Sequence, residues 1–226
     1  ITTHNPQFVS RNIDDLPSLI RLRKEEAVSK VGQVSKEDIS RLFEENQREV
    51  ETWKEAGLNI DDDDFKEEME AAKHSLWLNP LRCSAFFADV VLLVEGPTER
   101  ALIGRMLSGG EIEGIRPGVF VMDCLGKYNI HRFMNLFSLL GVPHSVIFDL
   151  DNGKHPFIET TIHDSATDIT LGIETFTKDI EDFLGVPQSK QPHRKPQHVM
   201  YYYREGKIEQ ERLDGLSELV TNVLSG

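Results

Sequence analysis

Four acidic residues follow apolar runs at two places in the chain, and their side chains could hold metal ions. Glu95 comes directly after the run VVLLV, and Glu99 follows one helical turn later. Asp149 and Asp151 stand at the end of a second apolar run. Carboxylates that converge in one crevice repel each other, and hard divalent cations such as Mg²⁺ remove that repulsion because they prefer oxygen ligands. Two such ions can clamp the attacking and leaving oxygens of a phosphodiester displacement.

These acids need a sheet that brings the two places together. The pattern predicts strands at residues 86–94, 119–122 and 145–148, and helices at residues 98–107 and 131–140. Such alternation is typical of an α/β fold in which helical crossovers join parallel strands. The active crevice of these sheets lies beyond the carboxyl ends of the strands, where Glu95 and Asp149 stand. Gly96 permits a tight turn there, and Pro97 presets φ for the next helix.

The rest of the C-terminal half shows less periodicity. It predicts a loop at residues 151–174, a helix at 177–183, a linker at 187–197, a strand at 198–203 and a terminal helix from about Leu213. The three tyrosines at 201–203 are interpreted as strand residues rather than as nucleophiles, because tyrosine favours strands. The histidines at 144, 155 and 163 lack the spacing of a zinc site.

Residues 35–80 predict a pair of helices without visible chemistry. Ser35 and Asp38 form the pattern of a capping box, and the run Asp61–Asp64 offers N-caps for the second helix. This acid run is interpreted as a solvated helix face with a capped N-terminus rather than as a metal site. Apolar residues recur at helical spacing, namely Ile39, Leu42, Phe43, Val50 and Trp53, and then Phe65, Met69, Ala72 and Leu76.

Composition indicates a globular protein of the cytoplasm. The net charge is −13, which argues against a partner held by a broad basic patch. No apolar run is long enough to cross a bilayer, and the start shows no signal-peptide pattern. The two cysteines have no metal-motif spacing and are too few for a disulfide framework. We therefore expect a cytoplasmic protein with no membrane partner.

The motif EGPTE after one strand, followed further along by Asp149-Leu150-Asp151 after another, resembles the Toprim domain. The sequence LLVEGPTE is similar to the form that this motif takes in the overcoming lysogeny defect (OLD) family of nucleases. That resemblance implies a Toprim-type parallel sheet flanked by helices and a metal-dependent DNA endonuclease. It implies two Mg²⁺ or Mn²⁺ ions held by Glu95, Glu99, Asp149 and Asp151, with Glu95 also catalytic. The intervening Gly126-Lys127 resembles a turn of the same family.

Two shorter matches extend the resemblance. Asp179-Ile180-Glu181 resembles a later acidic motif, which implies Glu181 as a further metal ligand, with Asp179 and Asp182 as alternatives. Lys195-Pro196 resembles a basic motif of the family, which implies that Lys195 is a catalytic charge partner. The alternative for Lys195 is an ordinary linker lysine.

Thr3-His4-Asn5-Pro6 resembles the switch-histidine loop near the end of ABC-type ATPase domains. The implied organisation is an ATPase tail at residues 1–10, a helical segment at 11–85 and a Toprim catalytic domain at 86–226. Because the chain contains no P-loop motif, ATP is expected only in the full-length protein. DNA and a second copy of the chain, in a homodimer, are the expected partners.

Two alternatives to a nuclease stay open. One is a Toprim module that binds nucleic acid or protein without cutting, although intact acids speak against it. The other is a topoisomerase-like or primase-like Toprim enzyme, although no separate tyrosine-bearing or polymerase module is visible.

Overall fold

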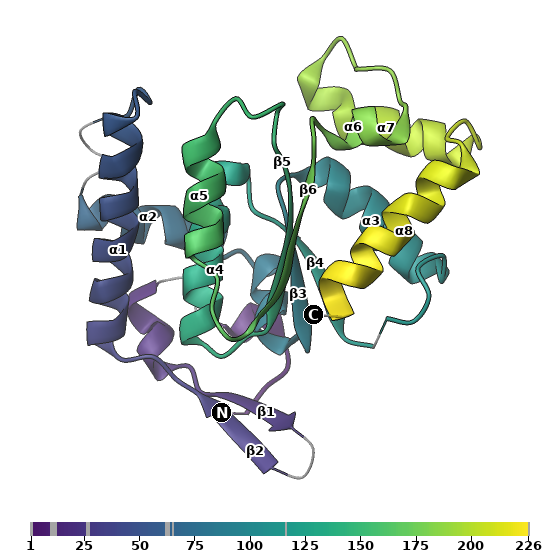
Figure 1. The fold of residues 1–226 in the computed structure, drawn as a ribbon. Helices are drawn as coiled ribbons and strands as arrows, with labels where there is room; N and C mark the ends of the chain where they lie inside the picture. The colour runs from purple at the N-terminus through teal and green to yellow at the C-terminus, as the bar shows by residue number, and fades with distance from the viewer. Residues whose placement is uncertain are drawn as a thin grey trace. The chain divides into compact units, whose positions relative to one another are not determined.

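The chain forms two compact units in a computed structural model that describes residues 2–9, 13–25, 28–61, 64, 66–115 and 117–225. One unit comprises Ile1–Ala88 with Met134–Val142, and the other comprises Asp89–Phe133 with Pro143–Gly226. Figure 1 labels the helices and strands of both units. Across the described residues, we find no helix with the length and apolar character needed to cross a membrane.

The second unit is built on a parallel sheet with the strand order β4-β3-β5-β6. Its strands are β3 (Val90–Val94), β4 (Val119–Asp123), β5 (His144–Asp149) and β6 (Thr170–Phe176). Every residue of β3 is buried, as expected for a parallel strand that is covered on both faces. Val94 pairs with Asp123 on one side and with Ile147 on the other, so the carboxyl ends of β4, β3 and β5 meet at one edge. The predicted α/β fold with a parallel sheet is confirmed.

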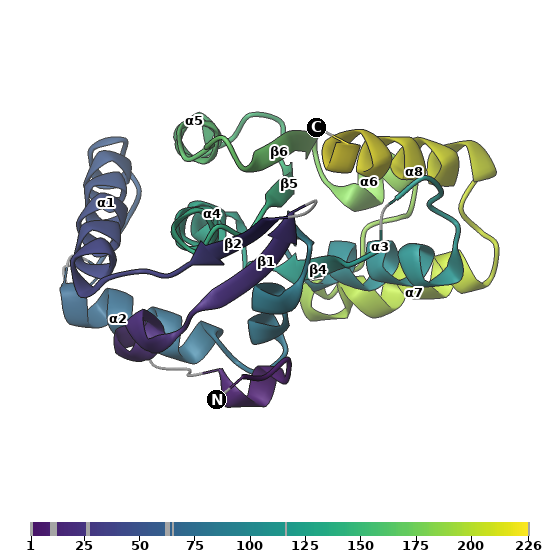
Figure 2. The same ribbon diagram turned by 90° about the horizontal axis from the view of Figure 1, so that it is seen from below.

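Helices cover both faces of this sheet. They are α3 (Pro97–Gly109), α5 (Pro156–Asp164), α6 (Ile180–Leu184), α7 (Lys195–Arg204) and α8 (Gln210–Ser225), while α4 (Ile130–Leu139) is shared between the units. Figure 1 shows α3 and α8 on one side of the sheet and α5 on the other. Figure 2 shows α7 running beside α3, and the two helices contact each other. Buried apolar residues of β3, α3, α7 and α8 share one core.

Three predictions in this unit are wrong. Residues 151–174 contain α5 and most of β6 rather than a loop. Residues 198–203, predicted as a strand, belong to α7, because Val199 at helical spacing packs into the core and this packing outweighs the strand preference of tyrosine. The first strand begins at Val90 rather than at residue 86, since a 3₁₀ helix occupies Arg82–Phe87.

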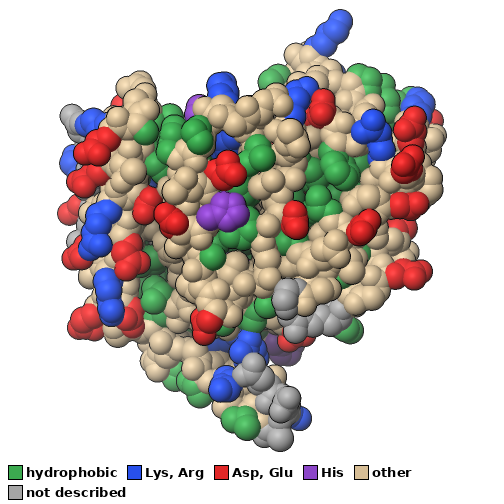
Figure 3. Space-filling view, viewed as in Figure 1, with side chains coloured by type: hydrophobic (Ala, Val, Ile, Leu, Met, Phe, Trp, Pro, Cys, Tyr) green, Lys and Arg blue, Asp and Glu red, His purple; other side chains and the backbone are tan. Residues whose placement is uncertain are grey.

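The first unit contains the predicted helices, α1 (Lys36–Glu55) and α2 (Glu67–Trp77). The capping box is confirmed, with the Asp38 N–H donating to Ser35 Oγ and the Ser35 N–H donating to Asp38 Oδ2. The predicted apolar stripe of α1 is buried. All glutamates of α1 except the half-buried Glu49 are exposed, and Figure 3 shows acidic and basic side chains interspersed over the face that α1 forms. These acids of α1 therefore form a solvated helix face. Of the acid run that was predicted to be solvated, Asp61 is exposed and Asp64 pairs with Lys73 at 3.0 Å.

The second helix differs from its prediction. It begins at Glu67 with Lys66 at the N-cap, and not at the aspartate run. Leu76 is 79% exposed, whereas Glu70 and His74 are buried, so the buried side of α2 is polar. Asp62, Asp63 and Phe65 lie outside the described residues.

The segment before α1 is not helical throughout, contrary to expectation. Strands β1 (Arg21–Glu25) and β2 (Val28–Gly32) pair in an antiparallel hairpin, and 3₁₀ helices occupy Pro6–Phe8 and Ile13–Ser18. The hairpin is anchored by Arg21, whose guanidinium donates to the carbonyl oxygens of Phe86, Ala88 and Gly141 at 2.7–2.9 Å. Residues 2 and 3 carry no strand, and Ile1 lies outside the described part. The predicted domain boundaries stay predictions.

Candidate active site

Three of the predicted acids line one pocket beyond the carboxyl edge of the sheet. Glu95 follows β3 directly, and its Oε2 atom accepts the backbone N–H of Asp149, the last residue of β5, at 3.3 Å. Glu99 lies in the first turn of α3 and accepts the Gly96 N–H at 3.0 Å, which fixes its carboxylate at the helix start. The pocket has a volume of about 290 Å³, and its lining comprises Glu95, Gly96, Pro97, Thr98, Glu99, Gly126, Asp149, Pro192, His193, Lys195 and Pro196.

Crowding and burial make these carboxylates unusually basic. Burial, with the charge of Glu99 adding to it, raises the pKa of Glu95 to about 7. Burial, followed by the charges of Glu99 and Glu95, raises the pKa of Asp149 to about 9. Burial also raises the pKa of Glu99. Shifts of this size are concentrated at functional sites, although buried ion-pair networks produce them too.

Asp151 lies apart from these three acids. Its side chain is 42% exposed and forms an ion pair with Lys127. Its backbone has φ +52°, in the left-handed region, and its N–H donates to the Lys178 carbonyl at 3.1 Å. Asp151 does not line the pocket. The structure therefore does not gather its carboxylate with those of Glu95, Glu99 and Asp149.

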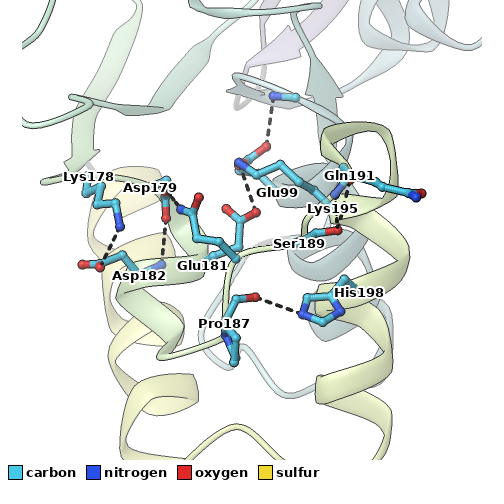
Figure 4. A network of polar contacts seen from close by, with 12 residues as sticks. Glu99, Lys178, Asp179, Glu181, Asp182, Pro187, Ser189, Gln191, Lys195 and His198 are labelled. Atoms are coloured by element: carbon cyan, nitrogen blue, oxygen red, sulfur yellow. Dashed lines mark hydrogen bonds and ion pairs between the residues drawn. The ribbon is translucent and has the colours of Figure 1, made fainter.

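Glu181 forms an ion pair with Lys195, which lines the pocket. Lys195 Nζ lies 3.0 Å from Glu181 Oε1, and Figure 4 shows the two side chains pointing toward each other beside Glu99. Burial opposes the charge on Lys195, but its bond to Glu181 and the nearby acids outweigh burial and raise its pKa. Of the three alternatives on α6, Glu181 is the fully buried one.

The other two acids of this motif have different partners. Asp179 is the N-cap of α6, where it accepts the Asp182 N–H at 2.8 Å and the Gln188 side chain at 2.5 Å. Asp182 is exposed and pairs with Lys178 at 3.3 Å. Geometry therefore favours Glu181 for the site. Figure 4 shows all three acids and their partners.

Four residues near the site had no role assigned to them from the sequence. Asp123 ends β4, is 5% exposed and pairs with Arg100 at 3.3 Å. Lys127 is buried beside the strand ends, and His193 lines the pocket. The rule that selected Glu95 and Asp149, an acid at the end of an apolar strand, would have selected Asp123 as well. No sequence signal marks His193, because it lies in a segment that read as a linker.

The donor set suits a hard divalent cation. The pocket acids supply only oxygen ligands, which Mg²⁺ and Mn²⁺ prefer. Asp149 Oδ1 and Glu181 Oε2 are buried and accept no hydrogen bond from any residue that the structure describes. Buried carboxylate oxygens of this kind are costly unless a proton or a cation joins them. Within the described ranges, no three His, Cys, Asp or Glu side chains stand close enough together to form a ready-made metal site.

Several histidines and tyrosines to which the sequence analysis gave no catalytic or metal-binding role make packing or hydrogen-bond contacts within the fold. His144 is buried in β5, with its Nε2 atom 3.0 Å from Thr170 Oγ1. His155 packs against Tyr128 and Phe157. The side chains of Tyr202 and Tyr203 pack partly against the core from α7.

A parallel α/β sheet with acids at the ends of its strands and a Gly-Pro turn into α3 is the arrangement that the sequence predicted for a Toprim-type domain. Residues 86–151 match the sequence profile of the family described as "Overcoming lysogenization defect protein-like, TOPRIM domain". Residues 86–151 thus match an OLD-like Toprim domain, the family that the sequence motifs resemble.

Individual proteins are also similar to the chain. The chain is 38% identical over 74 residues to Endonuclease GajA of Bacillus cereus (strain VD045), an alignment that covers 33% of the chain and 13% of GajA. Two solved structures of the C-terminal region of the Xanthomonas campestris pv. campestris OLD protein, phased with iodine and with platinum, are also similar. Each alignment covers 62% of the chain at 16% identity with a TM-score of 0.31. The alignments cover 85% of the iodine-phased structure and 82% of the platinum-phased structure.

Proposed function

We propose that this chain is the catalytic region of a metal-dependent DNA endonuclease that cuts phosphodiester bonds by two-metal catalysis. The observation that carries the proposal is the pocket in which Glu95, Glu99 and Asp149 face Lys195. Acids of raised pKa could hold a cation, and the partly exposed Lys195 beside them could meet an anionic phosphate. The OLD-like Toprim match and the similarity to an endonuclease support the same reaction class.

The residues have distinct roles in this proposal. Glu95, Glu99 and Asp149 would hold Mg²⁺ or Mn²⁺, with Glu181 and Asp151 as further ligands. When bound, the ions would lower the pKa of a water molecule and stabilise the leaving oxygen. Lys195 would offset the negative charge that develops on the phosphoryl group. Because the net charge is −13, DNA affinity should be weak, with Lys190 and Arg194 adding local positive charge near the pocket.

We also propose that the whole protein is an ATPase-coupled homodimer. The support is the Thr3-His4-Asn5-Pro6 motif together with the OLD-like family match. The matched segment spans 13% of the length of GajA. We expect this chain alone neither to bind nor to hydrolyse ATP, as measured by calorimetry and phosphate release.

A plasmid-nicking assay tests the endonuclease. Supercoiled plasmid should be nicked with Mg²⁺ or Mn²⁺, and not with EDTA or with Ca²⁺ alone. Glu95→Gln should be inactive, while Glu218→Gln, which removes an exposed charge on α8, should cut like the wild type. Robust cutting in EDTA by clean protein would refute the metal mechanism. DNA binding without cutting under every condition would favour the non-cleaving module instead.

A further inference from the structure

Lys127 is a buried lysine at the acid cluster to which the proposed mechanism gives no role. It begins a short 3₁₀ helix (Lys127–Asn129) just after β4, and it is 5% exposed. The loop before it is bound to the end of β3, because the Cys124 N–H donates to the Val94 carbonyl at 2.9 Å and the Gly126 N–H donates to the Glu95 carbonyl at 2.8 Å. The backbone therefore holds Lys127 beside Glu95.

The Lys127 ammonium lies among the oxygens at the end of β5. It forms an ion pair with Asp151 Oδ2 and donates to the Asp149 carbonyl oxygen at 3.3 Å. It is also close enough to Glu95 for its charge to lower the pKa of that carboxyl, against burial and the neighbouring acids. One ammonium thus contacts or faces three of the acids expected to bind metal.

We propose that Lys127 is a resident counter-ion of the acid cluster, whose ammonium balances Asp151 and Glu95 until a divalent cation displaces it. The inference rests on the proposed function insofar as a metal ion enters this cluster. Two positive groups cannot share the same carboxylates without repulsion, so the lysine and the ion must compete. The side chain is long and its charge is a compact point, so it can withdraw when the ion binds.

The pairing also accounts for the position of Asp151. Its left-handed backbone aims its carboxylate toward Lys127 rather than into the pocket. When Lys127 withdraws, Asp151 is released to serve as a ligand or to remain in solvent. Lys195 does not take part in this exchange, since its partner is Glu181 on α6.

The first test measures the metal-free protein and needs no nuclease activity. In EDTA at pH 8, Lys127→Met should lower the unfolding midpoint by about 5 °C, because the acid cluster loses its counter-ion. Lys127→Arg keeps the charge and should recover most of that loss. The matched control is Lys178→Met, which removes a half-exposed lysine paired with Asp182 and should shift the midpoint by no more than about 1 °C.

The second test measures Mn²⁺ binding by the electron paramagnetic resonance signal of free Mn²⁺. Lys127→Met should bind Mn²⁺ at least about tenfold more tightly than the wild type, because repulsion and competition are both removed. A purely structural lysine predicts the opposite, since a loosened site binds metal more weakly. Lys178→Met should bind Mn²⁺ like the wild type.

The outcomes separate this proposal from the proposed function. Unchanged or weaker Mn²⁺ binding by Lys127→Met overturns the counter-ion role, even if the wild type cuts DNA. If neither protein binds Mn²⁺, the metal mechanism and the competition both fail. An unfolding midpoint of Lys127→Met equal to that of Lys178→Met in EDTA overturns the counter-ion role regardless of metal.

Discussion

The Lys195 ammonium lies 3.0 Å from the Glu181 carboxylate, which is fully buried, and this ion pair joins the start of α7 to α6 beside the pocket. Of the lysines in the segment 190–195, only Lys195 lines the pocket. The pair therefore places one positive charge at the pocket, and it ties that charge to an acid rather than leaving it free.

Replacement of Lys195 should separate charge stabilisation from metal binding. Lys195→Met should slow plasmid cleavage by on the order of 10²-fold, because a positive group no longer offsets the developing charge. Mn²⁺ affinity should not weaken, since Lys195 is not a ligand. The control is Lys178→Met, which removes a lysine that pairs with Asp182 and does not line the pocket. Cleavage at the wild-type rate by Lys195→Met would return this residue to the role of a linker lysine.

Asp149→Asn should stabilise the metal-free protein while abolishing cleavage. The change keeps the shape of the side chain and removes one charge that burial and two glutamates oppose. We expect a higher unfolding midpoint in EDTA at pH 9 and no detectable nicking with Mg²⁺. Glu218→Gln serves as the exposed control and should change neither quantity. A lower midpoint for Asp149→Asn would show that the carboxylates do not strain the empty pocket.

Stability without metal should fall as the pH rises. The pKa of Glu95 is raised from 4.5 to about 7, and that of Asp149 from 3.8 to about 9. Between the ordinary and the raised values the folded protein binds more protons than the unfolded chain. The stabilisation is therefore complete below about pH 4 and is lost as the pH passes 7 and then 9. Thermal unfolding in EDTA from pH 5 to 9 measures this trend, and Glu95→Gln should flatten its lower part.

Metal affinity should change in the opposite direction. Ions bind deprotonated carboxylates, so Mn²⁺ affinity should increase from pH 6 to pH 9, with release of protons. Calorimetry in buffers of different ionisation enthalpy counts those protons. Affinity that is constant over this range would contradict the raised pKa of both acids.

Leu125→Gly should cost no stability, although it deletes an apolar side chain. Leu125 has φ +61°, where a bulky residue is strained, and it is 47% exposed. Relief of this strain should offset the greater freedom of glycine in the unfolded chain, with a net change between zero and about 1 kcal/mol of stabilisation. Leu125→Ile should destabilise, because branching at Cβ makes the left-handed region worse. Chemical denaturation measures the free energy of unfolding of the three proteins. We expect it to decrease in the order Gly, Leu, Ile at position 125, which is not the order that hydrophobicity predicts.

Local pattern was enough to predict the centre of the fold. A buried run such as Val90–Val94 can only be a covered strand or a core helix, and the Gly-Pro turn after Glu95 selects the strand. The capping box at Ser35 is equally local, since both of its hydrogen bonds join residues three apart. Predictions failed where the deciding contacts are distant in sequence. Residues 198–203 have strand propensity but become helical, because Val199 is buried in the core shared by α3 and β3.

The same division holds for the site. The sequence alone determined that acids end two parallel strands, and the geometry of a parallel sheet is enough to bring Glu95 and Asp149 to one edge. Tertiary structure decided which further groups face them. It buried Glu181 against Lys195, left Asp151 half-exposed, and placed Lys127 among the oxygens. These pairings depend on where the loops return to the sheet. They are selected by burial and by charge interactions, which act between residues that are distant in the sequence.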